Sequence, residues 1–362
     1  MKLPIDLKAV IEAATDIESA RNTPVSVSVL IDDSAPGDVA AHVRSAFVGA
    51  GAHARVTVGY FVGSAFSPYE GDDMAVIVAG FSEEVGRRAA EIRAAGVPVM
   101  VVTSMPRLVA DMASAYGNPI PEGDLVAPEG VEGCEADGDA ACESGEVAGA
   151  NAQSPEILDA PIPIDAAAAA ALDRRMGEWV VAACREKRLA LALSFPFVRR
   201  PLSLEAVSAT SLQNAGIGLV LFIPGADMPL MTLNQAKMLL QIAAAYGEPM
   251  SVARVKELAA IVGGAFACRS VARQVAGAVP AIGWAVKAGV GYAGTKAMGL
   301  AAVEYFERGG NIAGLAGVVS TATAKATQIA GDVAATPAGA RVLSTVKAAV
   351  RQGVASVLKK TE

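Results

Sequence analysis

The residues whose types and spacing come closest to a chemical motif form a short loop near the N-terminus. It follows the β-branched run Val25–Ile31 and reads Asp32-Asp33-Ser34-Ala35-Pro36-Gly37-Asp38. A phosphate-binding loop at such a place needs glycines that expose backbone amides, a lysine for the β- and γ-phosphates and a Ser or Thr for magnesium. This loop has one glycine, no lysine and three carboxylates, which repel a triphosphate. We therefore expect no nucleotide hydrolysis. The carboxylates are either cation ligands or caps of the following helix, and we favour the capping interpretation.

The cysteines, histidines and remaining acidic residues form no further catalytic or metal-binding pattern. The histidines are His42 and His53, and the cysteines, none of them in a C-x-x-C pair, are Cys134, Cys142, Cys184 and Cys268. Asp137 and Asp139 resemble the start of a calcium loop but lack its glycine and closing glutamate at the required spacing. We therefore predict no catalytic residue, no bound metal and no cofactor.

Alternating strands and helices must position the loop at residues 32–38. β-branched or continuous apolar runs predict strands over residues 25–31, 55–61, 74–79 and 97–102. Residues 5–20, 36–48 and 82–95 have helical patterns, and Gly96 should end the last of these helices. This alternation is typical of a small, mainly parallel α/β sheet.

The second half of the chain has a different pattern. Residues 119–160 contain 11 Asp or Glu but no Lys, Arg or aromatic residue, which predicts a disordered acidic linker. Everything after residue 161 indicates helix, including a capping box at Thr232–Gln235 and a helix end at Gly247. The predicted organisation is an α/β domain over residues 1–118, a linker over 119–160, an all-α domain over 161–310 and an amphipathic helical tail over 311–362.

Charge and hydropathy divide along the same line. The chain is 53% hydrophobic and 19% charged, but residues 1–160 carry a net charge of −16 and residues 161–362 carry +9. The acidic half should repel nucleic acid and anionic lipid, whereas the basic half, including the amphipathic stretch 341–360, could approach an anionic membrane. The apolar stretch 258–306 is interrupted by charges at Arg269, Arg273, Lys287 and Lys296. It is therefore either a buried bundle or hairpin, or a membrane-inserted hairpin.

Small residues recur within that apolar stretch at a spacing that lets helix backbones approach closely. The candidate close-packing positions are Ala285, Gly289, Gly291, Gly294 and Gly299.

A distinctive turn and helix suggest a family. In residues 219–247, Pro224, Gly225 and Pro229 predict a turn around Asp227, and a helix containing Gln235 then ends in Tyr246-Gly247. Together with the Gly-rich stretch 280–306, this resembles the helical domain of unknown function family 697, typified by YcjF-type membrane proteins and also found after Era-like GTPases. The resemblance covers residues 180–308 and implies association, at a membrane, rather than a reaction. The candidate interface or turn residues are Pro224, Gly225, Asp227, Pro229 and Gln235.

The resemblance also bears on the α/β domain. Residues 25–48 lie where the fused GTPases have their phosphate loop, and residues 97–104 are similar to the strand before their guanine-reading N-K-x-D. Here Thr103-Ser104-Met105-Pro106 replaces that motif. The resemblance therefore implies a degenerate, GTPase-like domain that serves as a scaffold.

These observations favour a non-enzymatic scaffold or interaction protein in the cytoplasm, peripheral or integral at the inner face of the cell membrane. Its expected partners are an unidentified protein and an anionic membrane surface, and not nucleic acid. Two alternatives stay open: a nucleotide-dependent switch with an unorthodox site, and a helical hairpin that inserts into bilayers and remodels them.

Overall fold

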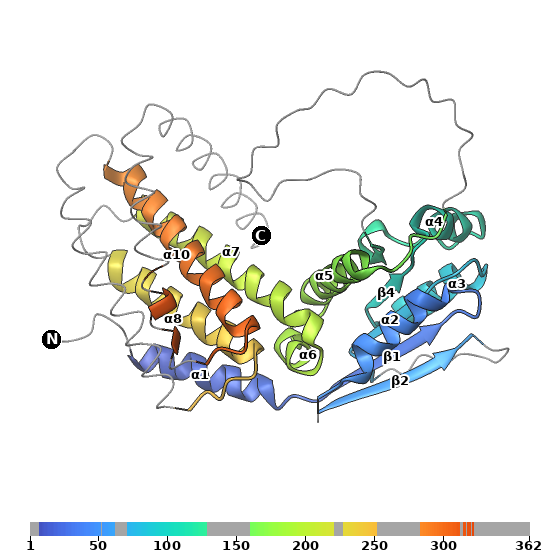
Figure 1. Ribbon diagram of the computed structural model, residues 1–362, viewed down its shortest axis with the longest axis horizontal. Coiled ribbons are helices and arrows are strands. Elements are labelled where there is room, and N and C mark those ends of the chain that lie inside the picture. The colour runs from blue at the N-terminus through green and yellow to red at the C-terminus, as the bar shows by residue number, and fades with distance from the viewer. Residues whose placement is uncertain are drawn as a thin grey trace, which may run out of the picture. The chain divides into compact units, whose positions relative to one another are not determined.

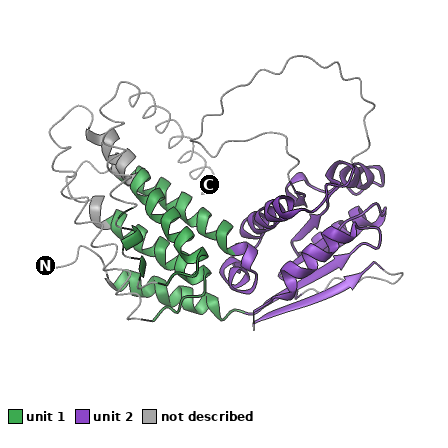
Figure 2. Cartoon of the chain, in the orientation of Figure 1, with its two compact units in different colours: residues 1–23, 199–362 green, residues 24–198 purple. Residues whose placement is uncertain are grey.

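The computed structural model describes residues 7–51, 53–61, 71–128, 160–220, 227–251, 283–311, 314–315, 317–319 and 321. Contacts divide the chain into two compact units, which Figure 2 shows in different colours. We call residues 24–198 the α/β unit, and residues 1–23 together with 199–362 the helical unit. The expected fold class, a parallel sheet with interleaved helices followed by a mostly helical region, is confirmed.

The α/β unit is built on a five-stranded parallel sheet in the order β2-β1-β3-β4-β5. Figure 1 labels β1, β2 and β4 of this sheet. β3 and β4 are buried along their whole length, as their continuous apolar sequences predict. The four strands expected from the sequence are present. The strands are β1 Val25–Ile31, β2 Ala54–Tyr60, β3 Met74–Val78, β4 Val99–Val102 and β5 Leu125–Val126.

Helices cover both faces of this sheet. From β1 the chain continues to β2 at one edge of the sheet, whereas from β3 it continues through β4 to β5 at the opposite edge. Because the crossovers between parallel strands are right-handed, α2 lies on one face of the sheet and α3 and α4 lie on the other. His42 in α2 lies 2.8 Å from Asp173 in α5, so α5 shares the face of α2. The helices are α2 Gly37–Val48, α3 Glu84–Ala94, α4 Pro106–Ala115, α5 Ala166–Ala183 and α6 Arg188–Ser194.

One apolar core lies on each side of the sheet. Under α3 and α4, Ile77, Val101 and Ile92 belong to a single buried cluster. At the end of α2, the ring of Phe47 packs against Phe195 and Phe197, with centroids 4.9 Å and 5.2 Å away. These cores hold β1 and β3 in place, so residues 32–36 and 79–83, which follow the two strands, begin at defined positions.

β5 corrects part of the linker prediction. The short helix η1 Glu122–Asp124 and β5 both lie within residues 119–160, so the expected disorder is wrong at residues 119–128, while residues 129–159 lie outside the described residues. Asp124, one of the acidic residues behind that prediction, forms an ion pair of 2.9 Å with Arg93 and accepts a hydrogen bond from the Trp179 indole. Because Asp124 has these two partners, its negative charge does not prevent residues 122–126 from folding against the sheet.

The helical unit takes its first helix from the N-terminus. The Arg21 guanidinium at the end of α1 donates hydrogen bonds to the carbonyls of Gly247 and Glu248, at 2.9 Å and 3.1 Å, just beyond α8. α1 therefore belongs with the helical unit rather than with the α/β domain, and residues 161–198 belong to the α/β unit rather than to the helical domain. The helices are α1 Leu7–Arg21, α7 Pro196–Val220, α8 Asp227–Ala245 and α10 Gly283–Glu307.

Two helix boundaries differ from the sequence prediction. The sequence after residue 161 predicts helix throughout, but α5 ends at Ala183 and α6 begins only at Arg188. α8 begins at Asp227, so Thr232 is buried inside the helix and does not cap its start. Gly247 ends the helix as predicted, with φ +90°. Among the described helices, none combines the length and apolar character needed to cross a bilayer.

Candidate functional site

The loop with the three carboxylates lies at the carboxyl ends of the parallel strands, between β1 and β3. Doubly wound sheets bind their ligands there, because loops on either side of the strand-order reversal leave a crevice. The loop after β1 contains Asp32, and the loop after β3 contains Gly80. We call this region the carboxyl edge.

Asp32 ties the two loops together. Asp32 is 3% exposed, and its carboxylate accepts hydrogen bonds from the backbone N–H groups of Ser34, Gly80 and Ser82 at 3.1, 2.9 and 3.3 Å. It also accepts the Ser34 hydroxyl at 2.9 Å, and that hydroxyl accepts the Phe81 N–H. The donors that an anionic ligand would use at this crevice are therefore taken by the side chains of Asp32 and Ser34.

Gly80 lets these loops touch. A Cβ added there would lie 2.3 Å from both the carbonyl carbon and oxygen of Ser34, and 2.5 Å from the nitrogen of Ala35. Since these are backbone atoms, they cannot rotate away. The β3 loop and the β1 loop are thus packed backbone to backbone, with no space for a ligand between Gly80 and Ser34.

Asp38 occupies the start of α2. One oxygen of its exposed carboxylate accepts the Val39 N–H at 2.9 Å, and the other accepts the Ile164 N–H at 3.1 Å. A helix N-terminus favours negative charge, so Asp38 supplies there what a bound phosphate would supply. Asp33, the third carboxylate of the loop, is exposed.

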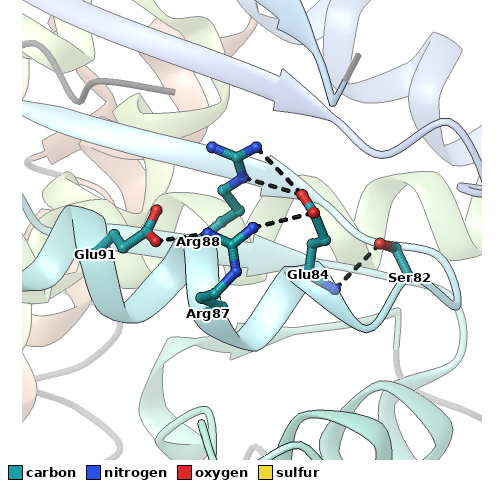
Figure 3. Close-up of polar contacts among 5 residues, drawn as sticks. All are labelled: Ser82, Glu84, Arg87, Arg88 and Glu91. Atoms are coloured by element: carbon teal, nitrogen blue, oxygen red, sulfur yellow. Dashed lines mark hydrogen bonds and ion pairs between the residues drawn. The ribbon is translucent and has the colours of Figure 1, made fainter. Parts of the chain in front are cut away.

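The Ser82 N–H donates to Asp32, and the Ser82 side chain contacts the ionic cluster at the start of α3 that Figure 3 shows. The Glu84 N–H donates to the Ser82 hydroxyl at 3.2 Å, and the Glu84 carboxylate accepts from Arg88 at 3.2 Å and pairs with Arg87 at 3.0 Å. Arg87 also binds Glu91 at 2.7 Å. The cluster stabilises the first turns of α3 and so holds the loop that carries Gly80.

Residues 160–164 cross the carboxyl edge, and we call them the crossing segment. The Ile162 N–H donates to the Ser104 carbonyl at 3.0 Å, beyond the end of β4, and the Ile164 N–H reaches Asp38 beyond the end of β1. Ile162 and Ile164 are half-buried, whereas Pro161 and Pro163 are exposed. Sequence reasoning missed this contact, because it assigns Ile162 and Ile164 to the all-α domain over residues 161–310.

Thr103, Ser104 and Met105, at the place where the resemblance would put a guanine-reading motif, are buried. The Thr103 hydroxyl accepts the Met105 N–H at 3.0 Å, which forms a tight local turn. Ser104 is 0% exposed, and its hydroxyl has no hydrogen-bond partner among the described residues. Residues 103–106 contain no carboxylate or amide side chain that could bind a guanine base.

A separate cleft of about 500 Å³ lies at the opposite, amino end of the strands, and the exposed His53 lies on its wall. Inside it, the Lys187 ammonium lies 2.7 Å from the Asp73 carboxylate and 3.0 Å from the Pro24 carbonyl. The Ser26 N–H donates to the other Asp73 oxygen at 2.8 Å. Asp73 and Lys187 thus neutralise each other.

Cys184 lies beside this cleft, with its sulfur 3.9 Å from the Asp73 carbonyl oxygen. Burial raises the pKa of the Cys184 thiol to about 12, and the Asp73 charge adds to the shift. We predict that the neutral thiol stabilises the fold fully below pH 9, and that this contribution is lost as the pH rises from 9 towards 12, because only the unfolded chain ionises there. Urea unfolding measures the free energy of unfolding at pH 8 and at pH 10. Between these two pH values it should fall by about 1 kcal/mol more in the wild-type chain than in Cys184→Ala. Equal losses in both proteins would contradict the prediction.

In the helical unit, Gln235 lies inside the bundle. It is fully buried, and its amide donates to the Thr295 hydroxyl at 2.8 Å, which also accepts from the Asn214 amide at 3.0 Å. Asn214 and Thr295 are buried as well, so the three side chains join α7, α8 and α10 through a neutral polar cluster. Sequence reasoning missed Asn214, and no local pattern marks it. Of the other turn candidates, Asp227 and Pro229 begin α8, while Pro224 and Gly225 lie outside the described residues.

The close-packing positions in α10 behave differently from one another. A Cβ at Gly299 would lie 2.4 Å from a methyl group of Val207 in α7, whereas a Cβ at Gly294 would meet no atom within 4 Å. Ala285, Gly289 and Gly291 lie in the part of α10 whose surroundings are not described.

We therefore predict opposite effects from the same substitution at two buried glycines of one helix. Gly294→Ala should stabilise the chain by up to about 1 kcal/mol, because alanine is the better helix former. Gly299→Ala should destabilise it by about 1–2 kcal/mol, because Val207 is β-branched and buried and cannot rotate freely. Thermal unfolding measures both, and Val207→Ala should relieve the effect at residue 299. Equal shifts for the two variants would exclude a tight contact at Gly299.

No protein-family model, curated protein or solved structure matches the chain. What the carboxyl edge can do chemically is therefore inferred from its own residues. Its carboxylates accept hydrogen bonds from the chain and repel phosphate. Among the described residues, no group of three or more His, Cys, Asp or Glu could hold a metal ion.

Proposed function

We propose that this chain is a non-enzymatic interaction protein. In this proposal the α/β unit is a degenerate GTPase-like domain that serves as a scaffold. The helical unit, which contains most of the stretch 180–308 that resembles family 697, associates with the cytoplasmic face of a membrane. An unidentified protein is the expected partner of the scaffold. The proposal explains why a sheet of the nucleotide-binding type lacks the groups that nucleotide binding needs.

The single observation that carries the proposal is the Asp32 carboxylate, which accepts four hydrogen bonds at the carboxyl edge. A nucleotide phosphate at this place would compete with a buried carboxylate for the same donors. The phosphate would also approach the Asp38 carboxylate at the start of α2, and the two negative charges would repel each other. Both effects oppose nucleotide binding.

Calorimetric titration of the full chain with GTP, GDP and ATP in the presence of magnesium tests the scaffold. The full chain is needed because β5 lies beyond residue 118 and would be lost from a shorter fragment. We expect no binding up to about millimolar nucleotide. Micromolar binding of any of the three would overturn the proposal in favour of a nucleotide-dependent switch.

The membrane part of the proposal rests on charge and resemblance. The helical unit, residues 1–23 and 199–362, contains 19 Lys or Arg and 12 Asp or Glu, and its net charge of +7 favours an anionic surface. We expect the chain to sediment with vesicles that contain anionic lipid at low salt, and to be released as the salt concentration rises. A chain that stays in the supernatant with anionic vesicles at low salt would refute membrane association.

A further inference from the structure

We propose that the carboxyl edge of the α/β unit is a binding surface for an extended segment of a partner protein, which replaces the crossing segment, residues 160–164. The inference rests on the proposed function, since it names the chemistry of the partner for the same scaffold.

The crossing segment is bound to the edge as a peptide ligand would be. Its two contacts, Ile162 N–H to the Ser104 carbonyl and Ile164 N–H to the Asp38 carboxylate, join the ends of β4 and β1. Because β3 lies between these two strands, the segment passes across the end of β3. It therefore covers the place where doubly wound sheets bind ligands.

The sequence of the segment defines what the surface accepts. Ile162 and Ile164 are half-buried, while Pro161 and Pro163 between them are exposed. Proline favours an extended backbone and has no N–H, so residues 161–164 have only two N–H donors, and both are bonded to the edge. The matching partner is an extended segment with aliphatic residues at alternate positions and proline between them.

The crossing segment, residues 160–164, leaves the hydroxyl of Ser104 without a hydrogen bond. The Ser104 hydroxyl is buried and has no partner among the described residues, although the carbonyl of the same residue accepts a hydrogen bond from the crossing segment. A buried hydroxyl without a partner is unfavourable, and a partner segment with a polar side chain beside it would satisfy it. Such a segment would bind more tightly than the crossing segment does, which is how a partner can displace residues that are part of the same chain.

Fluorescence anisotropy of a labelled peptide with the sequence of residues 159–166 tests the proposal on the full chain. The wild-type chain should bind it weakly, because residues 160–164 already occupy the surface. The double variant Ile162→Ser, Ile164→Ser should bind it at least about tenfold more tightly, because the competing segment is weakened. A peptide with aspartate in place of both isoleucines is the control and should not bind. Equal binding by wild type and variant, or binding of the control peptide, would overturn the proposal.

Two further measurements keep the test decisive. Pro163→Gly serves as a second variant in case the double variant fails to fold. It changes an exposed residue and loosens the segment, so it should also raise the affinity for the peptide.

A photoreactive group at the position of Ile162 in the peptide should cross-link to the tryptic fragment that contains Ser104. Cross-linking elsewhere would overturn the proposal, as would a double variant that forms dimers and ignores the peptide, since the occupant would then be a second copy. Nucleotide binding would overturn the scaffold function without changing these peptide results.

Discussion

Replacing Asp32 with alanine should destabilise the α/β unit by about 3–5 kcal/mol, one of the two largest effects expected in this protein. Asp32 is 3% exposed, and its carboxylate accepts hydrogen bonds from three backbone N–H groups and one hydroxyl. Alanine leaves the N–H of Gly80, which is buried, without an acceptor, and it also releases the β3 loop from the β1 loop. Each buried donor without a partner costs about 1–3 kcal/mol.

Urea unfolding measures this effect with a local probe. The chain has two tryptophans, and Trp179 lies in the α/β unit, so Trp284→Phe makes the fluorescence specific for that unit. Asp33→Ala is the matched control, because Asp33 is the neighbouring carboxylate and is exposed. It should change the free energy of unfolding by less than about 0.5 kcal/mol. Equal effects of the two substitutions would mean that Asp32 does not join the loops.

The second large effect is expected for Gly80→Ala. The added Cβ would lie 2.3 Å from backbone atoms of Ser34, which have no rotamer to change, so the two loops must separate. Separation breaks the hydrogen bonds from Gly80 and Ser82 to Asp32 as well. We expect a loss of about 3 kcal/mol or more, measured by the same Trp179 fluorescence in urea.

Gly37→Ala is the control for this substitution. Gly37 is in the partner loop at the start of α2, and a Cβ there would meet no atom within 4 Å. Alanine at that position should leave stability unchanged or raise it slightly, because it restricts the unfolded chain. Similar losses at residues 37 and 80 would show that glycine is needed for backbone freedom at both, and that loop contact is not the cause.

Several features of the carboxyl edge were predictable and several were not. The spacing of apolar runs predicts β1, β3 and the loop that follows each strand, because a strand shows its period of two within a few residues. The capping interpretation is not borne out in detail, because Pro36 is the N-cap of α2 and has no side-chain cap, while Asp38 lies in the first turn and accepts the N–H of its neighbour Val39. The partners of Asp32 were not predictable, because Gly80 and Ser82 lie about fifty residues away and carry no mark of that contact.

β5 and the crossing segment were missed for a related reason. β5 has two residues, too few for any periodicity, and its neighbours are acidic. It forms only because β4 offers an open edge, and Arg93 and Trp179 bind the nearby Asp124. Ile162 and Ile164 are likewise ordered by Ser104 and Asp38 and not by their own sequence.

The amino-acid sequence by itself determined that a parallel α/β sheet precedes a helical region, because strand and helix periods are local properties of the chain. It also determined which charged groups the loop after β1 itself contains, namely three carboxylates and no lysine. The tertiary structure alone decided that α1 joins the helical unit through Arg21, and that Gln235 meets Thr295 and Asn214. It also decided that the carboxyl edge is closed by Asp32 and covered by residues 160–164. These contacts join residues far apart in the chain, so they contribute to stability only after each unit has folded.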